Sequence, residues 1–218
     1  MNVDQQEIAK FEELAHRWWD PESEFKPLHQ INPLRLDWIR QRVDLSGVKA
    51  LDIGCGGGVL SEAMARLGAD VTAVDAAERN IRVARHHAAA SELDIDYRQG
   101  TAEHLASRGE HFDVVLNMEV VEHVADLPAF MDACCQLTRP GGVMVISTIN
   151  RTVASWVAAI VGAEYILRWL PRGTHQWRRF PTPKELETIL VANDFVVEDR
   201  VGVGVNPLNR KFRLHRYL

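Results

Sequence analysis

The chain has 218 residues, of which 46% are hydrophobic and 25% are charged, and its formal net charge is −5. This length and composition are typical of one globular domain, and the acidic balance argues against a nucleic-acid partner. Three cysteines without a C-x-x-C spacing predict a reduced, intracellular protein that lacks a structural zinc site. With no apolar signal region and no long apolar run, we expect no membrane-spanning helix.

Two helices are predicted ahead of the first strand. The first covers Asp4–Trp19, where apolar residues fall on one stripe. The second begins at Asn32-Pro33, a pair suited to the N-cap and the first helical position, and continues through Ile39. Because both helices precede the alternating part of the chain, we expect residues 1–45 to cap the ligand edge of a sheet.

A glycine-rich turn joins a predicted buried strand, Val48–Ile53, to a helix at Val59–Leu67. Residues 54–58 read G-C-G-G-G, and the next predicted strand, Asp70–Val74, ends at Asp75. Glycines let the backbone turn sharply against a ligand, and an acid at the end of the second strand can accept hydrogen bonds from ribose hydroxyls. This order of elements is typical of a nucleotide-binding α/β sheet.

The spacing of the glycines limits the classes of ligand that the loop could bind. Gly54, Gly56 and their neighbours give G-x-G-x-G with Val59 in sixth place, a loose match to the dinucleotide fingerprint, and no P-loop lysine follows. Asp52 places a negative charge beside the loop, which favours a cationic ligand over a polyphosphate. A nicotinamide or flavin site and a glycine turn without a ligand stay open as alternatives.

The rest of the chain continues to alternate. Further strands are predicted at Ile95–Arg98, Val114–Met118, Val143–Ser147 and Phe195–Val201, with a turn at Pro140-Gly141-Gly142 and with helices that begin near Glu78, Asp126 and Thr182. Alternation predicts a parallel sheet with helices on both faces and a ligand at the carboxyl ends of the strands. Asp75, Ala102, Glu103 and Met118 all fall at that edge, together with the glycine loop.

The segment after the fourth strand is rich in groups that can do chemistry. Glu119, Glu122 and His123 lie within one turn of one another, so two carboxylates and an imidazole can face one point. Such a set suits a divalent ion. His123 acting alone as a general base is an alternative, and so is an exposed acidic turn with a structural histidine.

Residues 150–181 interrupt the alternation. Thr152–Leu170 is mostly apolar and contains tryptophan and tyrosine, and arginines follow at positions 172, 178 and 179. Aromatic residues beside cations suit an interfacial amphipathic helix, so we expect residues 152–179 to contact an anionic membrane surface. A helix that packs on the protein's own lid or on a dimer partner is the alternative.

Five segments together carry a resemblance to a known family. They are D-x-G-x-G-x-G at 52–58 followed by Asp75, M-E-x-x-E-H-V at 118–124, F-K-P-L-H at 25–29, I-N-P-L-R at 31–35 and V-G-A-E-Y-I-L at 161–167. From about Ile8 to about Lys211 the chain resembles the ubiquinone biosynthesis O-methyltransferases, which are class I S-adenosylmethionine-dependent methyltransferases. The family continues past residues 212–214, so the closing strand is either Phe212–Leu218 or trimmed.

The resemblance implies a Rossmann-like seven-strand methyltransferase sheet with helices on both faces. It implies a single domain, 1–218, made of an N-terminal helical cap (1–45), a cofactor-binding core (46–149), an amphipathic lid (150–181) and a C-terminal helix with strands (182–218). Its activity would be methyl transfer from S-adenosylmethionine to ring hydroxyls of polyprenylated phenols and catechols, at the 2-polyprenyl-6-hydroxyphenol and 3-demethylubiquinol steps.

Site residues carried over by position follow from the same resemblance. Arg35 would pair with the methionyl carboxylate, Asp75 would bind the ribose, Gly54 would contact the cofactor and Met118 would lie near the adenine. Ala102 and Glu103 are weaker candidates for the adenine edge. A divalent cation such as Mg²⁺ on Glu119, Glu122 and His123 would stabilise the phenolate.

A lipid-tailed substrate implies a cytoplasmic protein at the inner face of the cytoplasmic membrane, with a biosynthetic complex as a further partner. Two other functions compete with this interpretation. One is a small-molecule methyltransferase of the same fold that acts on another acceptor, and the other is a catalytically silent cofactor-binding subunit.

Overall fold

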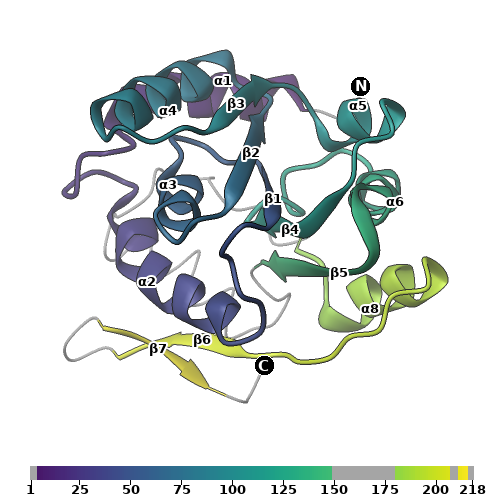
Figure 1. The fold of residues 1–218 in the computed structure, drawn as a ribbon. Helices are drawn as coiled ribbons and strands as arrows, with labels where there is room; N and C mark the ends of the chain where they lie inside the picture. Colours follow the sequence, from purple (N-terminus) through teal and green to yellow (C-terminus); the bar gives the residue numbers. More distant parts are fainter. Residues whose placement is uncertain (1–3, 149–179, 207–210, 216–218) are drawn as a thin grey trace.

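A computed structural model describes residues 4–148, 180–206 and 211–215, and its centre is a parallel sheet. Five strands lie in the order β3-β2-β1-β4-β5, and every neighbouring pair runs parallel (Figure 1). They are β1 (Lys49–Ile53), β2 (Asp70–Asp75), β3 (Asp96–Gln99), β4 (Phe112–Met118) and β5 (Thr138–Ser147). The predicted α/β class with a parallel sheet is confirmed.

Helices cover both faces of the sheet, as the alternation predicted (Figure 1). One face carries α3 (Val59–Ala65) and α4 (Glu78–Ala90), and the other carries α5 (Ala102–Ser107), α6 (Leu127–Leu137) and α8 (Pro183–Ala192). Strand β1 shows why. Ala50 packs into the apolar cluster of α3 and α4, whereas Leu51 and Ile53 pack into the cluster of α5 and α6. A strand that is buried on both faces needs a continuous apolar run.

The N-terminal cap consists of α1 (Gln5–Leu14), a 3-10 turn (Ala15–Arg17) and α2 (Lys26–Arg40). In Figure 1, α1 lies beside α4 and α2 lies beside α3. The residues between the two helices form a small core of their own, in which Trp18 stacks on Phe25 with ring centroids 3.8 Å apart.

The predicted start of α2 at Asn32-Pro33 is wrong. The helix already begins at Lys26 with Pro27 in its first turn, and Pro33 lies inside it. Asn32 caps nothing, because its side-chain amide donates to the carbonyl of Val59 at 3.1 Å and so ties α2 to α3. Burial of Ile31 and Ile39 offsets the helical hydrogen bond that an internal proline removes.

The predicted strand at Phe195–Val201 is also wrong. Thr182 and Glu185 form the expected capping box at the start of α8. At the end of α8, Asp194 adopts a positive φ of 62° and the N–H of Phe195 bonds back to the carbonyl of Leu190 at 2.9 Å. Phe195 therefore closes the helix in the manner of a Schellman motif, and no strand can start there.

The last two strands pair with each other instead of joining the sheet. β6 (Gly202–Val205) and β7 (Phe212–His215) form an antiparallel hairpin that lies beside α2 (Figure 1). The closing strand expected within Phe212–Leu218 is thus present, as β7. The strands number seven in the described part of the chain, as the resemblance implied, but they are divided between two sheets.

Strand β5 begins earlier than predicted, because its first residues form a bulge instead of a separate turn. The pairing with β4 jumps from Phe112–Thr138 to Val114–Val143, so residues 139–142 loop out of the ladder. Gly141 has a φ of 75°, which an L side chain rarely adopts. The glycines predicted to make a turn therefore make an irregularity within one strand.

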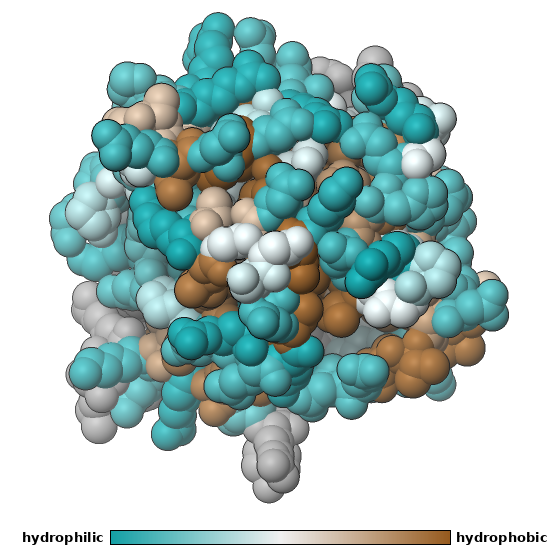
Figure 2. All heavy atoms as spheres, viewed as in Figure 1, coloured by the Kyte–Doolittle hydropathy of each residue, from teal (hydrophilic) through white to brown (hydrophobic). Residues whose placement is uncertain are grey.

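No helix in the described ranges is long and apolar enough to cross a membrane. The predicted amphipathic segment at 152–179 lies outside the described residues. On the face shown in Figure 2, apolar side chains gather in the middle of the molecule and at the lower right, over the region of α8. Large exposed apolar residues include Val191 in α8 and Val196 just after it.

Candidate functional site

The candidate site lies at the carboxyl ends of the central strands. In the register of the sheet, Ile53 is paired with Val74 on one side and with Asn117 on the other. The glycine loop that follows β1 therefore lies between Asp75, at the end of β2, and Met118, at the end of β4. The loops that the alternation predicted to meet do meet at this edge.

The glycine loop is shaped so that side chains cannot be added to it. Gly54, Gly56 and Gly58 all have positive φ values, of 68°, 54° and 86°. A Cβ at Gly54 would lie 2.5 Å from Val120, and a Cβ at Gly56 would lie 2.3 Å from the indole of Trp18. Both conformation and space require glycine here, and the bare backbone can approach a ligand closely.

Asp75, at the end of β2, accepts three hydrogen bonds at this edge. Its Oδ2 accepts from the N–H of Gly56 at 2.9 Å, and its Oδ1 accepts from the N–H of Ala77 at 2.8 Å and from the amide of Asn80 at 3.2 Å. Burial raises the pKa of Asp75, and these three donors oppose that rise. A carboxylate has about four acceptor sites, so Oδ2 can still accept from a hydroxyl of a ligand.

Asp52 faces the helix behind the loop. It is 3% exposed, and it accepts a hydrogen bond of 2.6 Å from the hydroxyl of Ser61 in α3. Burial raises the pKa of Asp52 from 3.8 to about 6, the bond from Ser61 works against that rise, and the charge of Asp75 adds to it. The geometry thus gives Asp52 a place behind the loop, where it ties β1 to α3.

Asp52 should make the protein less stable as the pH rises from about 4 to about 6. Its pKa is higher in the folded state, so the folded state binds the extra proton, and the stability that this proton contributes is lost through that window. The loss is up to about 2–3 kcal/mol. Urea titrations at several pH values give the free energy of unfolding. Between about pH 4 and about pH 6 this free energy should decrease less in the Asp52→Asn variant than in the wild type. Equal slopes for both proteins would contradict the assignment.

Arg35 reaches the site from the cap. Its guanidinium pairs with Glu119 and lies 3.4 Å from the hydroxyl of Ser147, which itself donates to Glu119 at 2.8 Å. Glu119 has a φ of 59°, a left-handed conformation that is uncommon outside glycine and that concentrates at functional sites. Arg35 is mostly buried, at 12% exposed, so a ligand carboxylate would have to share it with Glu119 or displace that residue.

Glu122 lies in the turn that follows β4. It is 5% exposed and accepts from the hydroxyl of Thr148 at 3.0 Å. Burial, and then the nearby charge of Glu119, raises the pKa of Glu122 well above its ordinary value. Burial and the carboxyl of Glu119 thus both disfavour the ionised form of Glu122.

His123 points in another direction. Its Nδ1 lies 2.9 Å from Oε2 of Glu7 in α1, and the ring of Phe11 meets it edge to face at 5.4 Å. Among the residues that the structure describes, no three His, Cys, Asp or Glu side chains are grouped so as to hold a metal ion. Residues 121–123 form a turn and not a helix, so proximity in sequence does not bring all three predicted ligands to one point.

The remaining predicted residues lie at the same carboxyl-end edge of the sheet. Ala102 is buried at the start of α5, where Thr101 caps the helix by accepting from the N–H of His104 at 3.3 Å. Glu103 follows in the first turn of that helix. Met118 is half-buried and packs against the apolar cluster under α3 and α4.

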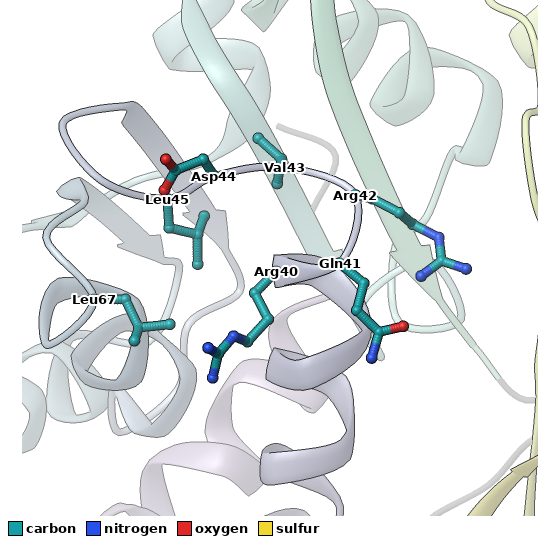
Figure 3. Close-up of a pocket in the computed structure, with 7 residues that line it drawn as sticks. All are labelled: Arg40, Gln41, Arg42, Val43, Asp44, Leu45 and Leu67. Atoms are coloured by element: carbon teal, nitrogen blue, oxygen red, sulfur yellow. The ribbon is translucent and has the colours of Figure 1, made fainter.

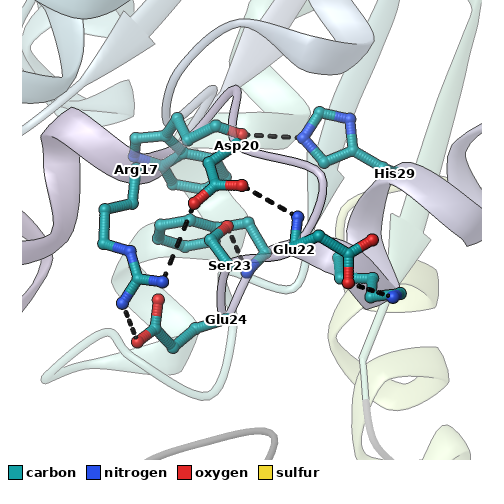
Figure 4. Close-up of polar contacts among 9 residues, drawn as sticks. Arg17, Asp20, Glu22, Ser23, Glu24 and His29 are labelled. Atoms are coloured by element: carbon teal, nitrogen blue, oxygen red, sulfur yellow. Dashed lines mark hydrogen bonds and ion pairs between the residues drawn. The ribbon is translucent and has the colours of Figure 1, made fainter.

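Sequence reasoning missed Asn80 and the position of Trp18. Asn80 is 2% exposed, donates to Asp75 and accepts from the indole N–H of Trp18 at 2.9 Å. The sequence pattern places Trp18 only within the apolar stripe of residues 4–19. Ion pairs of Arg17 with Asp20 and Glu24, and a bond between His29 and the carbonyl of Trp18 at 2.7 Å, hold the turn around this indole (Figure 4).

One further pocket lies elsewhere on the molecule. It has a volume of about 370 Å³ and is lined by the end of α2, by the segment that leads into β1 and by Leu67 (Figure 3). These residues precede β1 and β2, so the pocket is at the amino ends of the strands, opposite the candidate site. The pocket is therefore separate from the candidate site.

Comparisons with known proteins agree with this geometry. A family model described as a methyltransferase domain matches residues 9–199. A ubiquinone biosynthesis O-methyltransferase of Cereibacter sphaeroides is 55% identical over 97% of this chain and 91% of that protein, and one of Sinorhizobium medicae is 52% identical over 98% and 91%.

Solved structures share the fold at low identity. The magnesium protoporphyrin IX methyltransferase of Synechocystis PCC 6803, with bound S-adenosylhomocysteine, has a TM-score of 0.65 at 20% identity and covers 98% of this chain and 87% of that one. A possible histamine N-methyltransferase of Thermotoga maritima has a TM-score of 0.66 at 16% identity, with 97% and 92% covered.

The strand order, the glycine loop and the strand-end acid define the S-adenosylmethionine-dependent methyltransferase class. Within that class, the chain belongs to the family of ubiquinone biosynthesis O-methyltransferases.

Proposed function

We propose that the protein transfers a methyl group from S-adenosylmethionine to a ring hydroxyl of a polyprenylated phenol or catechol in ubiquinone biosynthesis. The single observation that carries the proposal is the joint geometry of the glycine loop and Asp75, in a chain 52–55% identical to enzymes of that name. The chain as a whole acts as one methyltransferase domain, with the N-terminal cap supplying Arg35.

The residues present fit the cofactor. Asp75 keeps an acceptor free for a ribose hydroxyl, and Gly54 is exposed on the loop where a ligand backbone contact is possible. Arg35 supplies the cation that a methionyl carboxylate needs, once Glu119 yields one of its contacts. Met118, Ala102 and Glu103 lie along the strand edge where an adenine would extend.

The chemistry then depends on position and on one proton. S-adenosylmethionine supplies a methyl group on a sulfonium, which is a good leaving group, so holding the acceptor oxygen in line does much of the work. A phenol with a pKa near that of tyrosine, about 10, is mostly protonated at neutral pH. We propose that Nε2 of His123 accepts the hydroxyl proton of the phenol as a general base. Glu7 bonds to Nδ1 of the same ring, so Nε2 is the nitrogen assigned to this role. The new O–C bond forms as the S–C bond breaks.

A divalent ion on Glu119, Glu122 and His123 stays a prediction. In their described positions these side chains do not form a ligand set, since Glu119 pairs with Arg35 and His123 with Glu7. No step is therefore assigned to a metal.

Turnover measurements test the proposal directly. Labelled S-adenosylmethionine and a catechol with a short prenyl tail should react to give an O-methylated product. The rate of this reaction should be the same with and without EDTA. Turnover that needs Mg²⁺ and is lost with EDTA would replace the histidine mechanism by the metal one. Cofactor binding without methyl transfer to any phenol would favour another acceptor or the silent-subunit function.

We further propose that residues 152–179 bring the enzyme to the inner, anionic face of the cytoplasmic membrane, where its lipid-tailed substrate resides and where other enzymes of the pathway could assemble with it. Support comes from their aromatic and basic composition. Wild-type protein should float with anionic liposomes, and a variant with Arg172, Arg178 and Arg179 changed to Glu should stay in solution. Equal flotation of both, or flotation of neither, would contradict the proposal.

A further inference from the structure

We propose that Trp18 of the N-terminal cap is a positioning residue for the ribose of the cofactor, acting through Asn80 and Gly56 on Asp75. This inference rests on the proposed function.

The first link runs through Asn80. The indole N–H of Trp18 donates to Oδ1 of Asn80 at 2.9 Å, and Nδ2 of the same amide donates to Asp75 at 3.2 Å. An amide can flip between two orientations that exchange oxygen for NH₂. Because Trp18 can only donate, it fixes the oxygen of Asn80 toward itself and the NH₂ toward the carboxylate.

The second link runs through the glycine loop. The N–H of Gly56 donates to the other oxygen of Asp75 at 2.9 Å. The same indole lies against Gly56 and Gly57, so closely that an added Cβ at either would fall within 2.3–2.4 Å of it. Trp18 therefore contacts two of the three donors that orient Asp75. It bonds to the amide of Asn80 and packs against the backbone of Gly56.

The position of Trp18 is itself well fixed. It is 8% exposed, stacks on Phe25 at 3.8 Å, and its carbonyl is bonded to His29 at 2.7 Å. Asn80 is 2% exposed, so water cannot easily replace the indole N–H. The cap thus orders the ribose acceptor before a ligand arrives, which lowers the cost of binding.

Trp18→Phe tests the relay, because phenylalanine keeps the Cβ and first ring atom that lie against Gly57, but it has no N–H to donate and lacks the outer indole atoms that lie against Gly56. Trp19→Phe is a matched control. The indole of Trp19 donates to the carbonyl of Gly57 at 2.8 Å and stacks on His87, so it braces the loop without a link to Asn80. Asn80→Ala removes the donor to Asp75 directly and serves if Trp18→Phe does not fold.

Calorimetry with S-adenosylhomocysteine and its 2′-deoxy and 3′-deoxy analogues gives the readout. Wild type and Trp19→Phe should bind the parent compound about 10-fold or more tighter than at least one deoxy analogue. Trp18→Phe and Asn80→Ala should bind the parent about 5- to 10-fold more weakly and should lose most of that preference.

Three outcomes would overturn the inference. An unchanged preference for the hydroxyls in both Trp18→Phe and Asn80→Ala would show that the relay does not act on the ribose. An equal loss in Trp19→Phe would show general loosening of the loop. A wild-type protein that binds no S-adenosylhomocysteine would instead overturn the proposed function, and the relay with it.

Discussion

Gly56→Ala is expected to abolish binding of S-adenosylhomocysteine and to lower the free energy of unfolding by about 2–5 kcal/mol. The new methyl group would lie 2.3 Å from the indole of Trp18, in a backbone conformation with a φ of 54° that alanine disfavours. The loop must then shift, and the N–H of Gly56 would lose its bond to Asp75. Urea unfolding and calorimetry measure the two effects.

Gly47→Ala separates crowding from backbone strain. Gly47 has a similar φ of 72°, but a Cβ there would meet nothing within 4 Å. It lies ahead of β1, at the opposite end of the strand, so only the conformational cost of about 1–2 kcal/mol should remain and cofactor affinity should not change. If both variants lost the same stability and both still bound the ligand, the close approach of Trp18 to the loop would be wrong.

His123→Ala is expected to reduce kcat by about 10²- to 10⁴-fold while leaving the affinity for S-adenosylhomocysteine unchanged. The reason is that the ring of His123, in the turn after β4, contacts Glu7 and Phe11, whereas the donors to Asp75 come from the backbone of the glycine loop and from α4 and its start. Single-turnover rates with a catechol acceptor, together with calorimetry, distinguish loss of the chemical step from loss of cofactor binding.

His111→Ala provides the matched substitution. His111 is exposed and bonds only locally, to the carbonyl of Gly109 at 2.9 Å, so its removal should leave kcat within about twofold of the wild type. A His123→Ala enzyme with full turnover would remove this residue from the mechanism. A large loss of cofactor affinity would instead give it a binding role.

Much of the site was accessible from local sequence. Alternating elements predicted where the strand ends meet, and the register of β1 with β2 and β4 confirms that the glycine loop, Asp75 and Met118 share one edge. Local chemistry also predicted the capping box at Thr182 and Glu185 correctly. These features depend on neighbours in the chain, so a single sequence carries them.

Two element starts were predicted wrongly because another hydrogen bond competes with the local preference. Asn32 looks like an N-cap, but its amide is used by Val59 in another helix. Phe195 looks like the start of a strand, but its N–H closes α8. The bond of Asn32 is tertiary and joins two helices, whereas the bond of Phe195 spans five residues and ends one helix.

By itself, then, the sequence determined the order of the five strands of the parallel sheet along the chain, the glycine loop, the acid that ends the second strand and the family of the chain. Only the tertiary structure decided which side chains face one another. It paired Arg35 with Glu119 and His123 with Glu7, and it placed Trp18 over Gly56. The cap and the strand ends are far apart in sequence, 84 positions for Arg35 and Glu119 and 116 for Glu7 and His123. Contacts over such separations depend on the packing of whole helices against the sheet, which local periodicity does not encode.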